Sequence, residues 1–107
     1  MWGIYPTMDG VAVVFYLPPG SSPAQHSQFR RRIYGEETSS WGGRYRYRRK
    51  GYLDAKPHVQ LNWGAVIVRS GDAARLMSVI RENGGIAHRR AVKLTKADER
   101  ILSSLPR

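Results

Sequence analysis

The residues from 44 to 50 alternate cations with aromatic rings in a pattern suited to a phosphodiester chain. The segment reads Arg-Tyr-Arg-Tyr-Arg-Arg-Lys, with five cations and two tyrosines in seven residues. Successive side chains of an extended strand point to opposite faces. One face would carry Arg44, Arg46 and Arg48, and the other would carry Tyr45, Tyr47 and Arg49. Because guanidinium groups contact phosphates and flat rings stack on bases, the pattern predicts a nucleic-acid-binding ribbon. The competing interpretation is an exposed edge strand with solvated arginines.

Other residues could extend the same surface. Arg31 and Arg32 lie on a predicted helix, where they are more exposed than their apolar neighbours. Arg89 and Lys93 would share the exposed face of a later strand. Trp41, followed by two glycines, could stack on a base or plug the core locally. The full candidate set is Arg31, Arg32, Trp41, Arg44, Tyr45, Arg46, Tyr47, Arg48, Arg49, Lys50, Tyr52, Arg89 and Lys93.

Catalytic and metal chemistry have weaker support. The lack of cysteine removes disulfides, thiolate catalysis and cysteine-based zinc sites. Metal-assisted hydrolysis needs clustered carboxylates, whereas the eight acidic residues are scattered. His26, His58 and His88 lack metal-ligand spacing, and no phosphate-binding loop is present. We therefore predict no catalytic residue, no metal site and no cofactor, and an enzyme is the less favoured class.

The whole chain is basic. Its 107 residues include 18 Lys and Arg against 8 Asp and Glu, which gives a net charge of +10. The cations occur in both halves of the chain, so the folded domain itself should have a positive surface. Such a field attracts polyanions, above all nucleic acid. The high share of arginine and the absence of cysteine would also suit a thermophile.

Apolar periodicity and turn residues predict alternating strands and helices within one domain, residues 1–107. The expected strands are 10–17, 44–50, 59–68 and 86–94, and the expected helices begin at 23, 70 and 96. The first helix should bury His26, Phe29 and Ile33, and the second Ala73, Leu76, Met77 and Ile80. Strand 10–17 should be buried on both faces, residues 35–43 should form a polar loop, and Trp63 should lie in the core.

This order predicts an α+β, ferredoxin-like βαββαβ fold. It would have an antiparallel sheet, two helices on one face and a short C-terminal helix. The apolar first and third strands would be central, and the cationic second and fourth strands would form the edges. An open α/β sandwich with other connectivity is the alternative.

Residues 14–18 (Val-Phe-Tyr-Leu-Pro) resemble the first strand of the small CRISPR adaptation nucleases, which runs from apolar residues into Asp, an apolar residue and Pro. Tyr16 stands where that family has its metal-binding Asp. The resemblance is confined to this short segment. It implies a nucleic-acid-binding scaffold of ferredoxin-like fold without metal-dependent hydrolysis.

The leading hypothesis is a non-enzymatic RNA-binding protein, such as a component of the ribosome or of another ribonucleoprotein. RNA is favoured because the basic and aromatic residues fall on strands and loops, and no helix-turn-helix pair is evident. The alternatives are a DNA-binding regulator or architectural protein, a metal-dependent nuclease, and a module that binds an acidic protein. No signal peptide or membrane span is expected, which predicts a cytoplasmic protein with no membrane partner.

Overall fold

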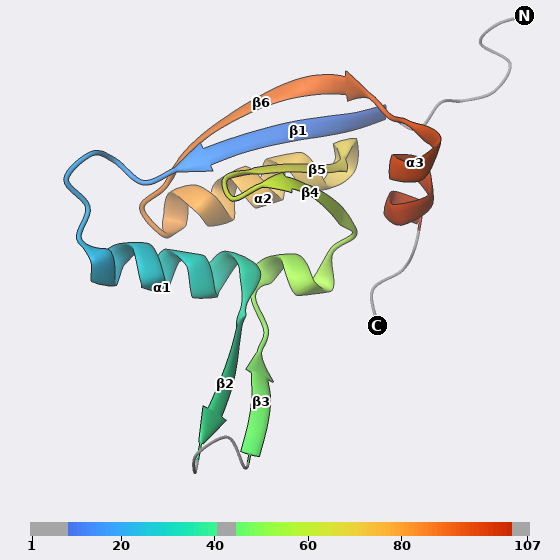
Figure 1. Ribbon diagram of the computed structural model, residues 1–107. Coiled ribbons are helices and arrows are strands. Elements are labelled where there is room, and N and C mark those ends of the chain that lie inside the picture. The colour runs from blue at the N-terminus through green and yellow to red at the C-terminus, as the bar shows by residue number, and fades with distance from the viewer. Residues whose placement is uncertain (1–8, 41–44, 104–107) are drawn as a thin grey trace, which may run out of the picture.

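A four-stranded antiparallel sheet, a separate two-stranded hairpin and three α-helices make up the computed structural model, which describes residues 9–40 and 45–103 (Figure 1). The elements in chain order are β1 (Asp9–Tyr16), α1 (Pro23–Tyr34), β2 (Glu36–Ser40), β3 (Tyr45–Arg49), the 3-10 helix η1 (Tyr52–Ala55), β4 (His58–Asn62), β5 (Ala65–Arg69), α2 (Ser70–Glu82), β6 (Ile86–Lys93) and α3 (Lys96–Ser103).

The sheet has the strand order β4-β5-β1-β6, so β1 and β5 are central. Val13 of β1 lies opposite Val66 of β5 on one side and Arg89 of β6 on the other. The central strands are the most apolar, and β6 is a cationic edge, as the sequence predicted. Charge on an edge strand opposes pairing with other chains.

The core lies between the sheet and the two longer helices, which occupy the same side of it (Figure 1). Phe15 of β1 packs against Phe29 of α1, with ring centroids 6.0 Å apart. The buried side chains come from all of these layers and include Val13, Phe15, Phe29, Ile33, Val66, Val68, Leu76 and Ile80. The core therefore depends on both helices, and it fixes where the C-terminal end of α1 points.

The helix boundaries follow the predicted caps. Ser22 and Gln25 form the expected capping box at the start of α1, with bonds of 3.1 and 2.7 Å. Thr95 and Asp98 cap α3 in the same reciprocal way. The predicted buried faces are confirmed except at His26, which is exposed.

The expected single strand at 59–68 is wrong, because the chain reverses at Trp63 and Gly64 to give β4 and β5. The Asn62 side chain accepts a hydrogen bond of 2.8 Å from the Trp63 amide and so stabilises the reversal. Gly64 passes against the Phe15 carbonyl, where a Cβ atom would collide with it. Trp63 therefore lies at a turn, 43 % exposed, rather than in the core.

This extra strand changes the connectivity. β4 occupies the sheet edge that the sequence assigned to the basic ribbon, and the ribbon forms β3 of a separate hairpin instead. The expected polar loop at 35–43 includes its partner strand, β2. The order of elements therefore differs from the expected βαββαβ succession, because a hairpin follows α1.

The prediction that strand 10–17 is buried on both faces is also wrong. Val13 and Phe15 face the helices and are buried, whereas Val14 and Tyr16 point to the other face and are exposed. Helices α1 and α2 cover the Val13 face of the strand, whereas the opposite face is exposed at Val14 and Tyr16. The structure describes no helix long and apolar enough to cross a membrane within residues 9–40 and 45–103.

Candidate functional site

The β2–β3 hairpin projects from the globule at the end of α1, on the side away from the sheet (Figure 1). In the strand register of the hairpin, Glu36 lies opposite Arg49 at the base, and Thr38 lies opposite Tyr47 further out. Two glycines, Gly35 and Gly51, form the root where both strands join the domain. β3 thus holds its cations outside the globule formed by the four-stranded sheet and the helices.

Arg48 anchors this root. Its guanidinium donates to the two carboxylate oxygens of Asp54 at 2.8 and 3.0 Å and to the carbonyl oxygen of Tyr34 at 2.7 Å. Asp54 also accepts a 2.8 Å bond from the amide of Gly51. Burial alone would raise the pKa of Asp54, but these hydrogen bonds and the charge of Arg48 lower it below its usual value. The Asp54 bond in turn raises the pKa of Arg48.

The ribbon residues therefore divide into two groups. Arg46, Arg49 and Lys50 are exposed and have no ion pair among the residues that the structure describes. The phosphate contact of Arg48 stays a prediction; in this structure its guanidinium bonds Asp54 and the Tyr34 carbonyl of α1 instead. The alternation of the strand directs Arg48 to one face, and the chain reversal at Gly51 brings Asp54 to meet it.

The predicted aromatic residues of the ribbon also separate. Tyr47 is 51 % exposed on β3. Tyr52 instead packs against the hydrophobic core, and its buried hydroxyl has no hydrogen-bond partner among the described residues, so the structure gives no support to its predicted stacking role. Tyr45 opens β3, but its side chain, like all of Trp41 and Arg44, lies outside what the structure describes.

The three arginines of α1 take three different environments. Arg30 lies over the ring of Trp63, 3.6 Å from its centroid. Arg31 forms an exposed ion pair with Glu36 at 3.8 Å, which ties α1 to β2. Arg32 faces a groove on the other side of the helix. Of these three arginines, only Arg30 and Arg31 adjoin the hairpin, and Arg30 is not among the site residues predicted from the sequence.

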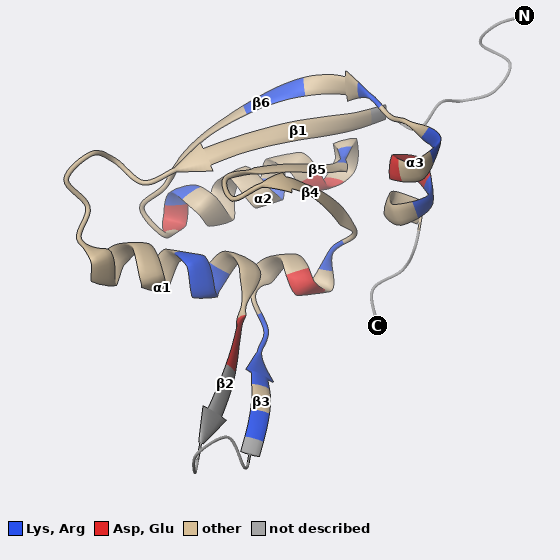
Figure 2. Cartoon of the chain, in the orientation of Figure 1, with Lys and Arg blue, Asp and Glu red and all other residues tan. Residues whose placement is uncertain are grey.

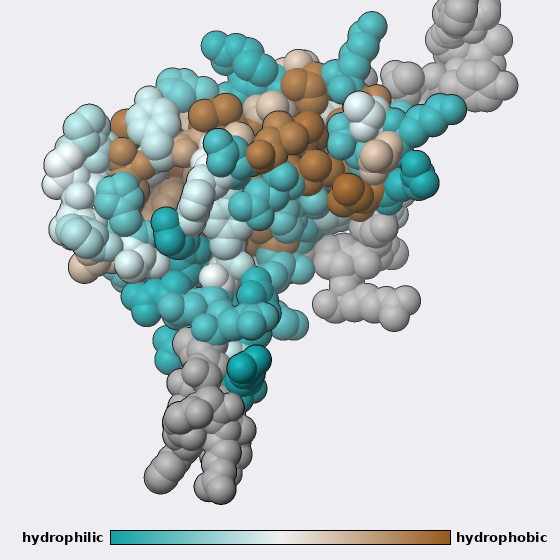
Figure 3. All heavy atoms as spheres, in the orientation of Figure 1, coloured by the Kyte–Doolittle hydropathy of each residue, from teal (hydrophilic) through white to brown (hydrophobic). Residues whose placement is uncertain are grey.

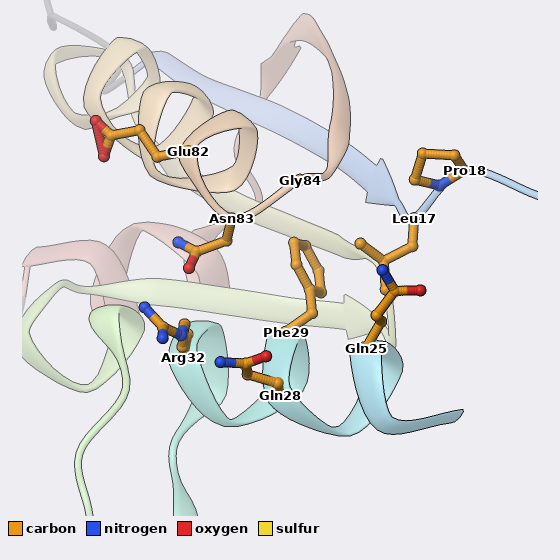
Figure 4. Close-up of a pocket in the computed structure, with 9 residues that line it drawn as sticks. All are labelled: Leu17, Pro18, Gln25, Gln28, Phe29, Arg32, Glu82, Asn83 and Gly84. Carbon is orange, nitrogen blue, oxygen red and sulfur yellow. The ribbon is translucent and has the colours of Figure 1, made fainter. Parts of the chain in front are cut away.

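The groove beside Arg32 has a volume of about 380 Å³ and lies between α1 and the turn that follows α2 (Figure 4). Phe29 forms part of its wall, and Asn83 and Glu82 lie across from Arg32. One cation and one carboxylate give this groove no net positive charge. It offers no clear continuation of the hairpin surface.

A second pocket, of about 480 Å³, lies at the root of the hairpin and is called here the hairpin-root pocket. It is lined by Arg30, Tyr34, Gly35, Arg48, Leu53, Asp54, His58, Gln60 and Trp63. The lining comes from α1, β3, η1, β4 and the turn after β4. His58, Gln60 and Trp63 are not among the site residues predicted from the sequence, because β4 and its turn reach this pocket only through the fold.

The cations of β6 form a separate group. Arg89 is exposed, as predicted for its face of the strand, although Ala87 on the same face is buried under the helices. The opposite face carries the exposed His88 and Arg90, and Lys93, on the same face as Arg89, is exposed at the end of the strand as predicted. His88 stacks on Tyr16 with ring centroids 5.9 Å apart, and the Tyr16 hydroxyl lies 3.2 Å from its Nε2 atom.

Figure 2 shows that β6 and the hairpin lie on opposite sides of the molecule. The idea that ribbon and fourth strand form one continuous cationic surface is therefore wrong. The hairpin group is the denser of the two, and it includes cations of both α1 and β3. Figure 3 shows hydrophilic residues over the same region, where α1 meets the hairpin.

The acidic residues serve mainly in local structure. Asp54 bonds Arg48, Asp72 bonds Arg69 at 3.2 Å, and Asp98 caps α3. No group of three or more His, Asp and Glu side chains that could hold a metal ion is found among the described residues.

Comparisons with known protein families, curated proteins and solved structures give no match to this chain.

Proposed function

We propose that this protein binds nucleic acid without catalysing a reaction and that the β2–β3 hairpin is its main contact. One observation carries the proposal: Arg46, Arg49 and Lys50 are exposed on an element that projects from the core, with no ion pair among the described residues. Cations held away from the body of a protein can approach phosphates without a clash between that body and the polymer. The net charge of +10 adds long-range attraction.

We also propose that the core sheet is a ferredoxin-like arrangement that carries the hairpin as an insertion. Without β2 and β3, the remaining elements run β1, α1, β4, β5, α2, β6. The sheet order β4-β5-β1-β6 then has its first and third strands in the centre. The insertion would convert a compact scaffold into one with a projecting arm.

RNA is the favoured ligand. The exposed aromatic residue Tyr47 lies beside the hairpin cations, and Trp63 with Arg30 lies near the root. Unpaired bases in RNA loops are typically bound by such rings and guanidinium planes. A role in a ribonucleoprotein, the ribosome included, follows as the corresponding cellular setting.

The test is the salt dependence of binding, followed by fluorescence anisotropy of labelled single-stranded RNA. We expect Arg46→Ala with Arg49→Ala to weaken binding across sequences. The same change should lower the slope of log K against log salt by up to about 1.4, which is about 0.7 for each lost phosphate contact. The matched control is Arg75→Ala with Arg81→Ala, which removes two exposed arginines of α2. It therefore has the same net charge as the test variant. Equal slopes for both double variants would reject the hairpin as the interface.

Duplex DNA is a second candidate, and a specific feature favours it. The hairpin is a two-stranded ribbon, and the major groove of B-form DNA admits such a ribbon, whereas the deep groove of A-form RNA does not. Competition between duplex DNA and single-stranded RNA at matched salt separates the two candidates. Tighter hairpin-dependent binding of the duplex would replace RNA by DNA as the ligand.

A further inference from the structure

The ring of Trp63 is held in place although it is substantially exposed. The Cζ atom of Arg30 lies 3.6 Å from the centroid of the Trp63 ring. The ring of Tyr34 meets the Trp63 ring edge-on, with centroids 5.4 Å apart. The Tyr34 hydroxyl also donates a 2.6 Å hydrogen bond to the carbonyl of Trp63. The ring thus has two contacts and the backbone of Trp63 a third, so the residue loses little further conformational entropy when a ligand stacks beside it.

The hairpin-root pocket next to this ring offers both donors and acceptors. His58 Nδ1 lies 2.9 Å from the Lys56 carbonyl, which can only accept, so Nδ1 carries the proton and Nε2 of the neutral ring is an acceptor. Gln60 is exposed and brings an amide that can donate and accept. A nucleobase edge presents the same mixture of groups.

The charges of the pocket also suit a nucleotide. The one carboxylate of its lining, Asp54, is compensated by Arg48 at 2.8 Å. Arg30 then remains as a cation directed at the aromatic ring. Because Arg48 belongs both to β3 and to this lining, the pocket is contiguous with the hairpin.

We infer that the hairpin-root pocket receives one unpaired nucleobase of a single strand whose phosphates lie along the hairpin. The base extends the Arg30–Trp63 stack by one layer, and Gln60 and His58 meet its edge. This inference rests on the proposed function and specifies its ligand, since a fully paired duplex has no free base to insert. The protein would then prefer single strands to duplexes, with the preference set at the root and the salt dependence set by the arm.

The first test follows Trp63 directly by fluorine NMR of protein that contains 5-fluorotryptophan. The Trp63→Phe variant identifies the Trp63 resonance among those of the three tryptophans. We expect that resonance to shift when a short single-stranded RNA is added. It should not shift with the matching duplex, or with the same strand made entirely of abasic nucleotides, although both still bind the hairpin.

The second test measures affinity. Trp63→Ala should weaken single-strand binding about tenfold, which corresponds to the loss of one stacked base, and leave duplex affinity unchanged. Arg30→Ala should weaken single-strand binding more than duplex binding, since it removes both a stacking partner and one positive charge. Trp63→Phe keeps an aromatic face and should retain most of the affinity. Circular dichroism confirms that each variant is folded, and Gln60→Ala, at an exposed strand position, tests the pocket without touching the stack.

Failure of the pocket and failure of the proposed function give different results. Suppose that wild-type protein binds single strands through Arg46 and Arg49, but the Trp63 resonance does not shift and the Trp63→Ala and Arg30→Ala variants bind single strands as tightly as wild type. Only the pocket inference is then rejected. If wild-type protein binds no polynucleotide at low salt, the proposed function fails and the pocket inference fails with it.

Discussion

Gly35 and Gly51 lie back to back at the root of the hairpin, so close that a Cβ atom on Gly51 would collide with the amide nitrogen of Gly35. Gly35 has a φ of +82°, a conformation that L side chains rarely adopt. Its amide still donates a 2.8 Å bond to the Arg31 carbonyl, which ends α1. These two glycines let both hairpin strands leave the domain side by side, so they determine where the exposed cations lie.

Substitution at this contact should destabilise the protein. We expect Gly51→Ala to lower the free energy of unfolding by about 1–3 kcal/mol, because the new methyl group would meet rigid backbone. The matched control is Gly71→Ala in the first turn of α2, where a Cβ meets nothing within 4 Å. That variant should be neutral or slightly more stable, since alanine favours helix. Urea denaturation of both variants checks this, and equal stabilities would contradict the close approach.

The two partly buried tyrosines near the hairpin should respond differently to loss of the hydroxyl. Tyr34→Phe removes the 2.6 Å bond to the Trp63 carbonyl and should cost roughly 1 kcal/mol of unfolding free energy. Tyr52→Phe removes a buried hydroxyl with no partner among the described residues and should be neutral or stabilising. Thermal unfolding compares the two variants directly. A larger loss for Tyr52→Phe would show that its hydroxyl has a partner after all.

Tyr34 should also ionise at a higher pH than an ordinary tyrosine. Burial raises its pKa to about 12, above the usual value near 10. A raised pKa means that the stability which depends on the neutral hydroxyl is complete below about pH 10 and is lost as the pH rises toward 12. Absorbance at 295 nm should therefore show a late ionisation step, and Tyr34→Phe should remove it. A single transition near pH 10 for every tyrosine would contradict this environment.

Asp54 should have the opposite dependence at acidic pH. Its pKa is lowered, because the bonds and charge that favour its ionised form outweigh the effect of burial. Its contribution is then present above the unfolded value of about 3.9 and is lost as the pH falls through the lower folded pKa. We expect the difference in unfolding free energy between wild type and Asp54→Asn to be constant from about pH 7 to pH 5 and to shrink below about pH 4. Urea denaturation measures this difference. The same difference at all of these pH values would contradict a lowered pKa of Asp54 in the folded protein.

Local patterns in the sequence were enough to predict the helices and much of the core. Phe29 and Ile33 repeat at the spacing of one helix face, and the Ser22–Gln25 box marks where that helix starts. The turn at Trp63 was missed, because alternating apolar residues on both sides of it read as one continuous strand. A stronger weight on Asn62 and Gly64, which are both turn formers, could have found it.

The composition of the site was harder to predict for a different reason. Strand alternation gives the face on which Arg48 lies, but not that Gly51 turns the chain so that Asp54 meets that face. Likewise, Arg30 and Trp63 are far apart in sequence and meet only through the packing of α1 beside the β4–β5 turn. Local periodicity therefore identified the cationic ribbon, and long-range packing decided which of its cations forms an ion pair.

Arg46 and Arg48, which lie on the same face of β3, should respond differently to substitution by alanine. Arg48→Ala should lower the melting temperature, because the Asp54 carboxylate and the Tyr34 carbonyl each lose a donor. Arg46→Ala should leave the melting temperature unchanged, since Arg46 is exposed and has no ion pair among the described residues. At a temperature where both variants are folded, Arg46→Ala should lower the salt slope of RNA binding by about 0.7. Arg48→Ala should leave that slope as it is, and a reversed pattern would show that Arg48, rather than Arg46, meets the phosphates.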